Sequence, residues 1–144
     1  MNRGSSRRER DAGFTLMEML VVLVVIALIA AVAIPQVMRM LESAKTRAAR
    51  IQLHTVSQAV NFYQLDNDAF PTTAEGLAVL VDAPADSETW AGPYLRRAEQ
   101  MKDPWGRPLI YRSPAGDKPF SLKTLGADGR AGGTGEDRDV EVGE

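Results

Sequence analysis

The chain has 144 residues, of which 44% are hydrophobic, and its formal net charge is −2. This length allows one small domain with an appendage, and the charge balance argues against a nucleic-acid-binding protein because no net positive field is available to gather phosphates. Cysteine is absent, which excludes disulfides and thiolate metal sites as braces for the fold.

The first predicted element is an apolar helix. Phe14 to Ile34 is a run of 21 residues with one ionisable side chain, Glu18. As a helix this run spans about 30 Å, which is the hydrocarbon thickness of a bilayer. A core helix buried on all sides is disfavoured because the rest of the chain is too short to surround it. We therefore expect a transmembrane or filament-core helix over residues 14–35.

Three interpretations of this segment are open. In the first, the preceding arginines and the small-x-small triplet Ala31-Val32-Ala33 mark a secretory signal peptide, although the run exceeds the usual apolar region of about 7–15 residues. A plain signal anchor explains the length but not the acidic residue. In the third interpretation Glu18 has a charged partner, since a carboxylate at the bilayer centre costs about 2.5–3.5 kcal/mol on insertion scales. The arginines are Arg3, Arg7, Arg8 and Arg10.

The third interpretation is favoured by a resemblance. Gly13-Phe14-Thr15-Leu16-Met17-Glu18 resembles the processing site of type IV prepilins. The resemblance implies cleavage between Gly13 and Phe14, N-methylation of Phe14, and attraction between the carboxylate of Glu18 and the α-amine of a neighbouring subunit. Two opposite charges attract strongly at low dielectric, whereas either charge alone is costly to bury. Residues 1–13 would be a leader peptide that is removed. The resemblance places this leader in the cytoplasm, whereas the count of basic residues leaves the orientation open.

Beyond Pro35, which is expected to kink or loosen the helix, an amphipathic helix is predicted over residues 36–65. Its apolar residues recur at spacings of three and four, and we expect them to pack on a domain. We expect Asp66-Asn67-Asp68, followed by Phe70-Pro71, to end the helix. The apolar face consists of Val37, Leu41, Ala44, Ala48, Ile51, Thr55, Val56, Ala59, Val60 and Tyr63.

Residues 66–107 are expected to form a loop region. Within it, Thr72-x-x-Glu75 has the form of a capping box and predicts a short helix through Val81. Residues 108–113 and 120–125 are predicted as two strands joined by a turn that contains Ala115-Gly116-Asp117. The predicted fold class is α+β, with a long helix packed on a small antiparallel sheet. Residues 36–144 would form one globular domain, whose segment 108–144 holds the sheet and a C-terminal loop.

Five later segments resemble the major pseudopilins of type II secretion, which belong to the type IV pilin-like superfamily. The resemblance extends from the leader to around Asp139. It implies a pilin-like fold and a structural subunit of a helical homopolymer, the periplasmic pseudopilus, which drives export of folded proteins across the outer membrane. The segments are Tyr63-x-x-Asp66-Asn67, Phe70-Pro71-Thr72-Thr73-x-x-Gly76-Leu77, Gly92-Pro93-Tyr94-Leu95, Asp103-Pro104-Trp105-Gly106 and Leu125-Gly126-Ala127-Asp128-Gly129.

The same resemblance implies partners and a location. The partners would be further copies of the chain, minor pseudopilins, the inner-membrane assembly platform, and the prepilin peptidase that also methylates Phe14. The chain would cross the bacterial inner membrane once, with its domain in the periplasm. The alternative is a type IV pilin of an extracellular fibre for adhesion or DNA uptake. The absence of cysteine disfavours it, because many true type IV pilins close their C-terminal region with a disulfide.

The segment from Gly126 to Glu144 is rich in Gly, Asp and Glu. Its composition alone allows a flexible acidic tail or a calcium loop with hard oxygen ligands. The resemblance implies a structural Ca²⁺ ion in this loop. By position it implies ligation by the side chains of Asp128 and Asp139 and by the carbonyl of Leu125, with Asp137 and Thr134 as further candidates. The end of the chain departs from the family, whose usual Ile and Asn-Trp are replaced by Val140-Glu141-Val142-Gly143-Glu144.

Catalytic motifs are not apparent. The sequence has no nucleophile–base pair, no phosphate-binding Gly-Lys-Ser/Thr loop and no Rossmann fingerprint. The single histidine, His54, is expected to be a surface or packing residue of the amphipathic helix, and Trp105 a packing anchor. We therefore expect that the protein is not an enzyme.

Overall fold

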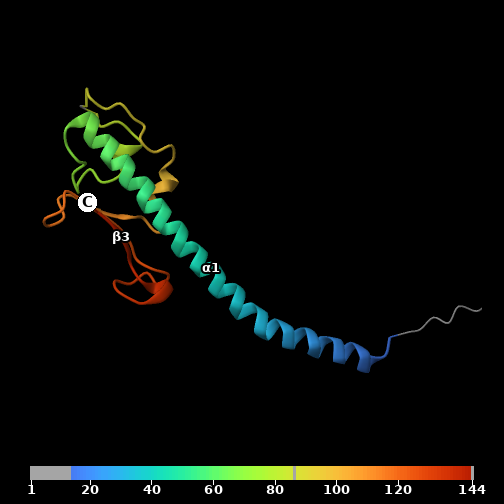
Figure 1. Cartoon of the computed structure of the whole chain (residues 1–144). Coiled ribbons are helices and arrows are strands. Elements are labelled where there is room, and N and C mark those ends of the chain that lie inside the picture. The colour runs from blue at the N-terminus through green and yellow to red at the C-terminus, as the bar shows by residue number, and fades with distance from the viewer. Residues whose placement is uncertain (1–13, 86, 144) are drawn as a thin grey trace, which may run out of the picture. The chain divides into compact units, whose positions relative to one another are not determined.

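The computed structural model describes residues 14–85 and 87–143. It divides the chain into two compact units, of which the first ends at Met38 and the second begins at Arg39. The predicted leader, residues 1–13, lies outside the described residues. Figure 1 shows the described elements, which in chain order are α1 (Leu16–Asn67), η1 (Ala78–Leu80), η2 (Ala98–Met101), β1 (Ile110–Arg112), β2 (Ser121–Thr124), η3 (Gly135–Asp137) and β3 (Val140–Val142), where η denotes a short 3₁₀ helix.

Helix α1 begins and ends where the local chemistry predicts. At its start, the hydroxyl of Thr15 accepts a hydrogen bond from the backbone N–H of Glu18 (3.2 Å), which satisfies one of the free donors of the first turn. The helix continues through Pro35. It ends at Asn67, and Asp68 follows with a φ of 55°, a left-handed conformation that acidic and amide residues tolerate. The predicted end of the helix is confirmed.

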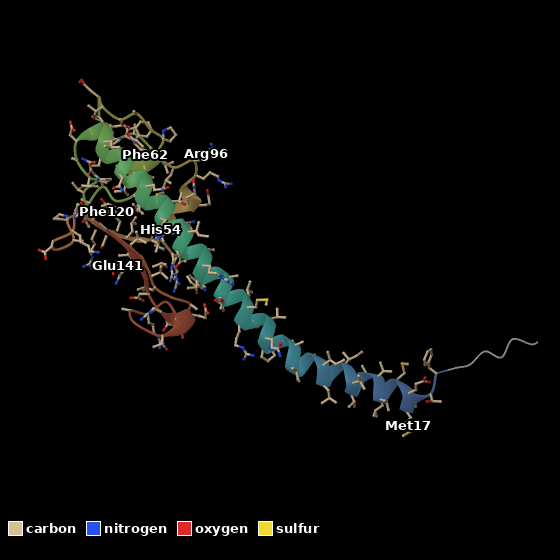
Figure 2. All side chains as sticks on the ribbon, viewed as in Figure 1. Met17, His54, Phe62, Arg96, Phe120 and Glu141 are labelled. Atoms are coloured by element: carbon tan, nitrogen blue, oxygen red, sulfur yellow. The ribbon has the colours of Figure 1, made fainter. Side chains whose placement is uncertain are left out.

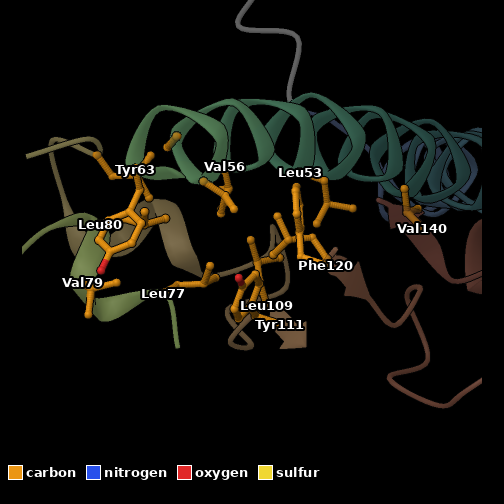
Figure 3. Packing of buried hydrophobic residues seen from close by; sticks show 14 residues of the cluster. Leu53, Val56, Tyr63, Leu77, Val79, Leu80, Leu109, Tyr111, Phe120 and Val140 are labelled. Carbon is orange, nitrogen blue, oxygen red and sulfur yellow. The ribbon is translucent and has the colours of Figure 1, made fainter. Parts of the chain in front are cut away.

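The second unit is built on one face of α1. Figure 3 shows Leu53, Val56 and Tyr63 on the same side of this helix, directed toward a core that includes Leu80 and Phe120. Leu53, Leu80 and Phe120 have no exposed surface, so burial of these side chains supplies the main stabilising contribution. The buried residues of α1 are Ala49, Leu53, Val56, Ser57, Ala59, Val60 and Tyr63.

The first half of the predicted packing face is not part of this core. The exposed residues of the predicted face are Val37, Leu41, Ala44, Ala48, Ile51 and Thr55, whereas the second half of the face is buried from Val56 onward. The residues that are buried on α1 form a different series, which begins at Ala49, one position after Ala48. Periodicity alone does not tell which of two neighbouring series a domain covers, so the prediction for these six residues was wrong.

The sheet is antiparallel in the order β1-β2-β3. Tyr111 pairs with Leu122 between β1 and β2, and Thr124 pairs with Val140 between β2 and β3. The hairpin between β1 and β2 closes at Ala115 and Lys118. These strands and the α+β class confirm the prediction of a long helix on a small antiparallel sheet. Strand β3 was not predicted, although Val140-Glu141-Val142 alternates between a buried and an exposed side chain as a strand does.

The connection between α1 and β1 consists of turns and short 3₁₀ helices. The capping contacts between Thr72 and Glu75 form, since the backbone N–H of Thr72 donates to Oε2 of Glu75 (2.8 Å) and the N–H of Glu75 donates to Oγ1 of Thr72 (3.2 Å). No α-helix follows among the described residues of this connection. Gly76 has a φ of 64°, which ends the turn, and between Gly76 and Val81 the structure has only the short 3₁₀ helix η1. The predicted helix through Val81 was therefore wrong.

Candidate functional site

The first unit exposes an apolar surface along α1. Its side chains project on all sides of the helix axis, as Figure 2 shows. Leu16 is 92% exposed and Val32 is 64% exposed. The helix contains a segment that is long and apolar enough to cross a membrane, and none of that segment is buried inside the chain. Apolar side chains left in water are unfavourable, so this surface requires a cover of lipid or of other protein.

Glu18 is the one acidic residue in this apolar surface. It lies in the first turn of α1, where the helix dipole favours a negative charge. Among the described residues, its carboxylate forms no ion pair. Gly13, the predicted residue before the cleavage point, lies outside the described residues, and Phe14 is the first residue that the structure describes. Phe14 and Glu18 thus lie close together in sequence at the exposed N-terminal end of α1.

The segment between β2 and β3 folds back on itself to form a closed loop, which we call the C-terminal loop (residues 125–139). The backbone N–H of Ala127 donates to the carbonyl of Glu136 (2.9 Å), and the N–H of Asp139 donates to the carbonyl of Gly132 (3.2 Å). At Gly126 a side chain would collide with the backbone of Asp137, so this close approach requires glycine. The loop also reaches α1, because the hydroxyl of Thr46 donates to Oε2 of Glu136 (2.7 Å).

Asp139 is the candidate metal ligand whose surroundings are most informative. Its Oδ1 atom is buried and accepts no hydrogen bond from the described residues, whereas Oδ2 lies 3.9 Å from Nζ of Lys123. A buried carboxylate oxygen without a partner is unfavourable. A cation bound at this oxygen would remove the penalty.

The other candidate side chains are exposed. Asp128 accepts a hydrogen bond at Oδ1 from the backbone N–H of Arg130 (3.0 Å), and Thr134 and Asp137 lie on the surface of the loop. Within residues 14–85 and 87–143, no group of three or more His, Cys, Asp or Glu side chains is arranged to hold a metal. A calcium ion here would therefore need backbone carbonyls as well as carboxylates, which is common for this ion.

The carbonyl of Leu125 is already engaged by an arginine. Nη2 of Arg107 donates to the carbonyls of Leu125 (2.5 Å) and Gly126 (2.6 Å). Nε of the same guanidinium lies 3.0 Å from Oδ2 of Asp103, a side chain with 1% exposure. The hydroxyl of Thr124 also donates to this oxygen (2.6 Å). Arg107 thereby ties the start of the C-terminal loop to a buried carboxylate.

Three oxygen atoms of the loop are candidates for ligation of a calcium ion. The orphaned oxygen of Asp139 and the glycine-permitted turns of the loop favour a hard cation bound by oxygen. The carbonyl of Leu125 has two lone pairs, one of which is taken by Arg107. The residues that would hold the ion are Asp139 and Asp128, with the carbonyl of Leu125 as a further candidate. A bound ion would offset the negative charge of the loop and tie it to the end of β2.

Sequence reasoning did not identify the role of Asp103 and Arg107. Asp103-Pro104-Trp105-Gly106 was noted as a family segment, and Trp105 as a packing anchor. In the structure, Oδ1 of Asp103 accepts hydrogen bonds from the backbone N–H groups of Trp105 (3.0 Å) and Arg107 (2.8 Å). An Asp that is followed closely by Pro and Gly is a signal for such a turn. The indole of Trp105 donates to Glu42 of α1 (2.9 Å), and this bond, with help from Lys45, lowers the pKa of Glu42.

Two family models match the chain. The prokaryotic N-terminal methylation motif matches residues 8–34, and the type II secretion system protein G model matches residues 36–143. An apolar helix that carries this motif, followed by an α+β domain with a small antiparallel sheet, defines the class of membrane-anchored, pilin-like proteins.

Curated relatives and a solved structure agree with these matches. The chain is 38% identical to the type II secretion system core protein G of Pseudomonas aeruginosa, over 93% of this chain and 96% of that protein. It is 35% identical to the core protein G of Vibrio cholerae, over 93% of this chain and 92% of that protein. The crystal structure of the major pseudopilin from the type 2 secretion system of enterohaemorrhagic Escherichia coli is similar with a TM-score of 0.53 and 28% identity, over 68% of this chain and 85% of that chain.

The chain belongs to the type II secretion system protein G family. The prediction of a major pseudopilin is therefore confirmed. The alternative of a type IV pilin for an extracellular fibre is not favoured, because the relatives are core components of type II secretion.

Proposed function

We propose that this chain is the repeating structural subunit of a periplasmic pseudopilus that drives folded proteins across the outer membrane, and that it has no catalytic role. The observation that carries the proposal is the exposed apolar length of α1, which residues 14–85 and 87–143 leave uncovered. A subunit with such a surface has two stable surroundings, a bilayer and a bundle of identical helices.

Before assembly, the subunit is proposed to lie in the inner membrane. The chain would cross the membrane once, with residues 36–144 in the periplasm. A prepilin peptidase would cleave between Gly13 and Phe14 and methylate the new amine of Phe14. The match to the N-terminal methylation motif over residues 8–34 supports this step. Further proposed partners are the inner-membrane assembly platform and the minor pseudopilins.

Glu18 is proposed as the residue that sets the register of assembly. Its carboxylate has no ion-pair partner among the described residues, and an unpaired charge in an apolar bundle is unfavourable. The methylated amine of Phe14 on a neighbouring copy would supply the opposite charge. Each copy carries both the carboxylate of Glu18 and the amine of Phe14, so every added copy offers a new site to which the next copy can bind. Head-to-tail contacts of this kind produce an open filament when they do not close into a ring.

A structural Ca²⁺ ion is proposed for the C-terminal loop. The support comes from the orphaned oxygen of Asp139, with Asp128 and the carbonyl of Leu125 as further ligands, and Asp137 and Thr134 as the remaining candidates. The ion would compensate the charge of a loop that also contains Glu136. It would thereby stabilise the exposed surface of the assembled filament.

The test of the filament proposal is the variant Glu18→Ala in the full chain, expressed with the other components of the secretion system. We expect the variant to insert into the membrane and to be cleaved, but to form few pseudopili, because the carboxylate is needed only between copies. Pseudopili are counted by electron microscopy of sheared cells. Met17→Ala, which changes the same helical turn without changing charge, is the matched control. Filaments from Glu18→Ala at the parental yield would contradict the role of this residue.

A further inference from the structure

A second apolar surface lies on α1 within the second unit, and none of the residues that the structure describes covers it. Ile51 is 68% exposed, Phe62 is 60% exposed and Leu65 is 69% exposed. The spacing of eleven and three residues places the three side chains within about 60° of one another around an α-helix. The core residues Leu53 and Val56 occupy another face (Figure 3). We call the first set the outer stripe, and Figure 2 labels Phe62 within it.

The charges around the outer stripe are strongly separated along the chain. The segment from Arg39 to Arg50 contains four basic residues and one acidic residue, Glu42. The segment from Ile51 to Leu95 contains six acidic residues and no Lys or Arg. The second unit therefore has a basic segment where its part of α1 begins and an acidic segment where α1 ends.

The acidic side chains gather at the end of α1. Asp66 and Asp68 lie at and just after its last turn. The hydroxyl of Thr89 donates to Oδ1 of Asn67 (2.7 Å), which holds the neighbouring Glu88 at the same end. Glu88 and Glu75 line one hollow there together with Asn67. The C-terminal end of a helix already carries a partial negative charge, so this end attracts cations.

The two charged ends do not neutralise each other within the chain. Among residues 14–85 and 87–143, the ion pairs are Lys45–Glu42, Arg107–Asp103 and Lys123–Asp139. Arg47 and Arg50 are exposed and pair with no carboxylate in this part of the chain. From Arg50 to Asp66 the helix rises about 24 Å, which exceeds the screening length of about 8 Å at physiological salt. Within the described residues both charged ends are therefore free to meet opposite charges on a second molecule.

We propose that the outer stripe is the docking surface for a second copy of this chain that is shifted along the helix axis. In this arrangement the acidic end of one copy (Asp66, Asp68 and Glu88) faces the basic segment of the next (Arg47 and Arg50), and the apolar side chains of the stripe are covered between them. A pair of copies joined in this way keeps one free acidic end and one free basic segment, so further copies can add at both ends of the pair. The inference rests on the proposed function and names the contact between the globular units.

The experiment is a charge exchange in the full chain, with the other secretion components present. Arg47→Glu with Arg50→Glu reverses the basic segment, and Asp68→Lys with Glu88→Lys reverses the acidic end. We expect each double variant to lower the number of pseudopili per membrane-inserted subunit by about tenfold, because attraction at two contacts becomes repulsion. The chain that carries all four changes restores opposite charges and should recover most of the loss.

Two controls separate this contact from general effects of charge and folding. Arg96→Glu reverses an exposed charge outside the stripe and should assemble like the parent. Phe62→Ser removes an apolar group of the stripe and should lower assembly while leaving the melting temperature unchanged, because Phe62 takes no part in the core.

Two results would overturn the inference. In the first, the double variants form as many pseudopili as the parent. In the second, the chain with all four changes forms fewer pseudopili than either double variant. In both cases the proposed function would still stand, provided that the parent chain forms pseudopili. A parent chain that forms no pseudopili would instead overturn the proposed function, and the inference with it.

Discussion

Arg107 links three parts of the second unit through one guanidinium. It contacts the buried carboxylate of Asp103, the end of β2 at Leu125 and the first turn of the C-terminal loop at Gly126. The planar guanidinium suits this task because its donors point in fixed directions. A lysine at the same position would keep the charge but not the simultaneous bonds to a carboxylate and two carbonyls.

Arg107→Ala should lower the free energy of unfolding by about 3 kcal/mol, because removing one partner of a buried ion pair leaves the other charge uncompensated. Arg107→Lys should lose about half as much. Arg96→Ala, which removes an exposed arginine, should have almost no effect. Chemical denaturation of the detergent-solubilised full chain measures all three. Equal stability of the Arg107→Ala and Arg96→Ala variants would show that the guanidinium does not brace the loop.

The proposed calcium site predicts a response to calcium that depends on Asp139 and Asp128. If the ion binds only the folded chain, saturation at about 100 times its dissociation constant adds about 2.7 kcal/mol of stability. Chelation should therefore lower the melting temperature and raise protease sensitivity between Gly126 and Asp139. Asp139→Ala or Asp128→Ala should remove the response to added calcium. Magnesium should replace calcium poorly because it requires tighter octahedral geometry. Melting curves that superimpose with calcium and with chelator would contradict the site.

At the scale of elements, the turn that begins at Thr72 is stabilised by an ionised side chain. Hydrogen bonds from the backbone and the hydroxyl of Thr72 hold the pKa of Glu75 below its usual range. A carboxyl whose pKa is lowered by folding stabilises the fold above the pKa of the unfolded chain, and this contribution is lost as the pH falls through the folded value.

Glu75→Gln should therefore lower the melting temperature at pH 7, and the difference from the parent should shrink as the pH falls from the unfolded value of about 4.3 through the lower folded value. In a Thr72→Val background, which lacks the hydroxyl but keeps the backbone donor, the difference at pH 7 should be smaller. The test is to measure melting temperatures between pH 3 and pH 7 for the parent, Glu75→Gln, Thr72→Val and the chain that carries both changes. A difference that is constant over that range would exclude the ionised carboxylate as its cause.

The elements differ in how much of them the sequence could predict. Helix α1 and its end at Asn67 were predictable because propensity, apolar spacing and the stop signal at Asp66-Asn67-Asp68 agree. Strands β1 and β2 were predictable from two apolar runs around a turn. The helix after Thr72 was mispredicted because a capping box also stabilises a single turn, and Gly76 at a positive φ ends it.

The candidate site was only partly predictable for a related reason. The apolar helix and Glu18 belong to one continuous segment, so they can be predicted from the local sequence. The bond from Arg107 to Leu125 joins residues 18 positions apart, and the orphaned oxygen of Asp139 depends on packing around β3. Neither feature has a local signature. The same limit applies to the two apolar stripes of α1, since only the position of the sheet decides which one is buried.

For the whole molecule, the proposed processing predicts where the mature chain begins. The mature protein should begin at an N-methylated Phe14, because the match to the methylation motif covers residues 8–34 and Gly13-Phe14 is the expected cleavage point. Mass spectrometry of the membrane-extracted protein measures this directly. A Gly13→Val variant, in which the residue before the cleavage point is enlarged, should retain the leader. A mature chain that starts at Ile34 would instead establish a secretory signal peptide and remove the anchor.

The uncovered apolar length of α1 also bears on how easily a subunit changes its surroundings. Lipid tails and the side chains of neighbouring copies are about equally apolar, so transfer between them changes little hydrophobic free energy. The partition of the subunit between lipid and filament therefore depends mainly on the interactions of its few polar groups. Chief among these is the carboxylate of Glu18, which lacks a partner when the subunit is alone in lipid. The membrane can then serve as a reservoir from which a pseudopilus grows and into which it dissolves, at little net cost in burial.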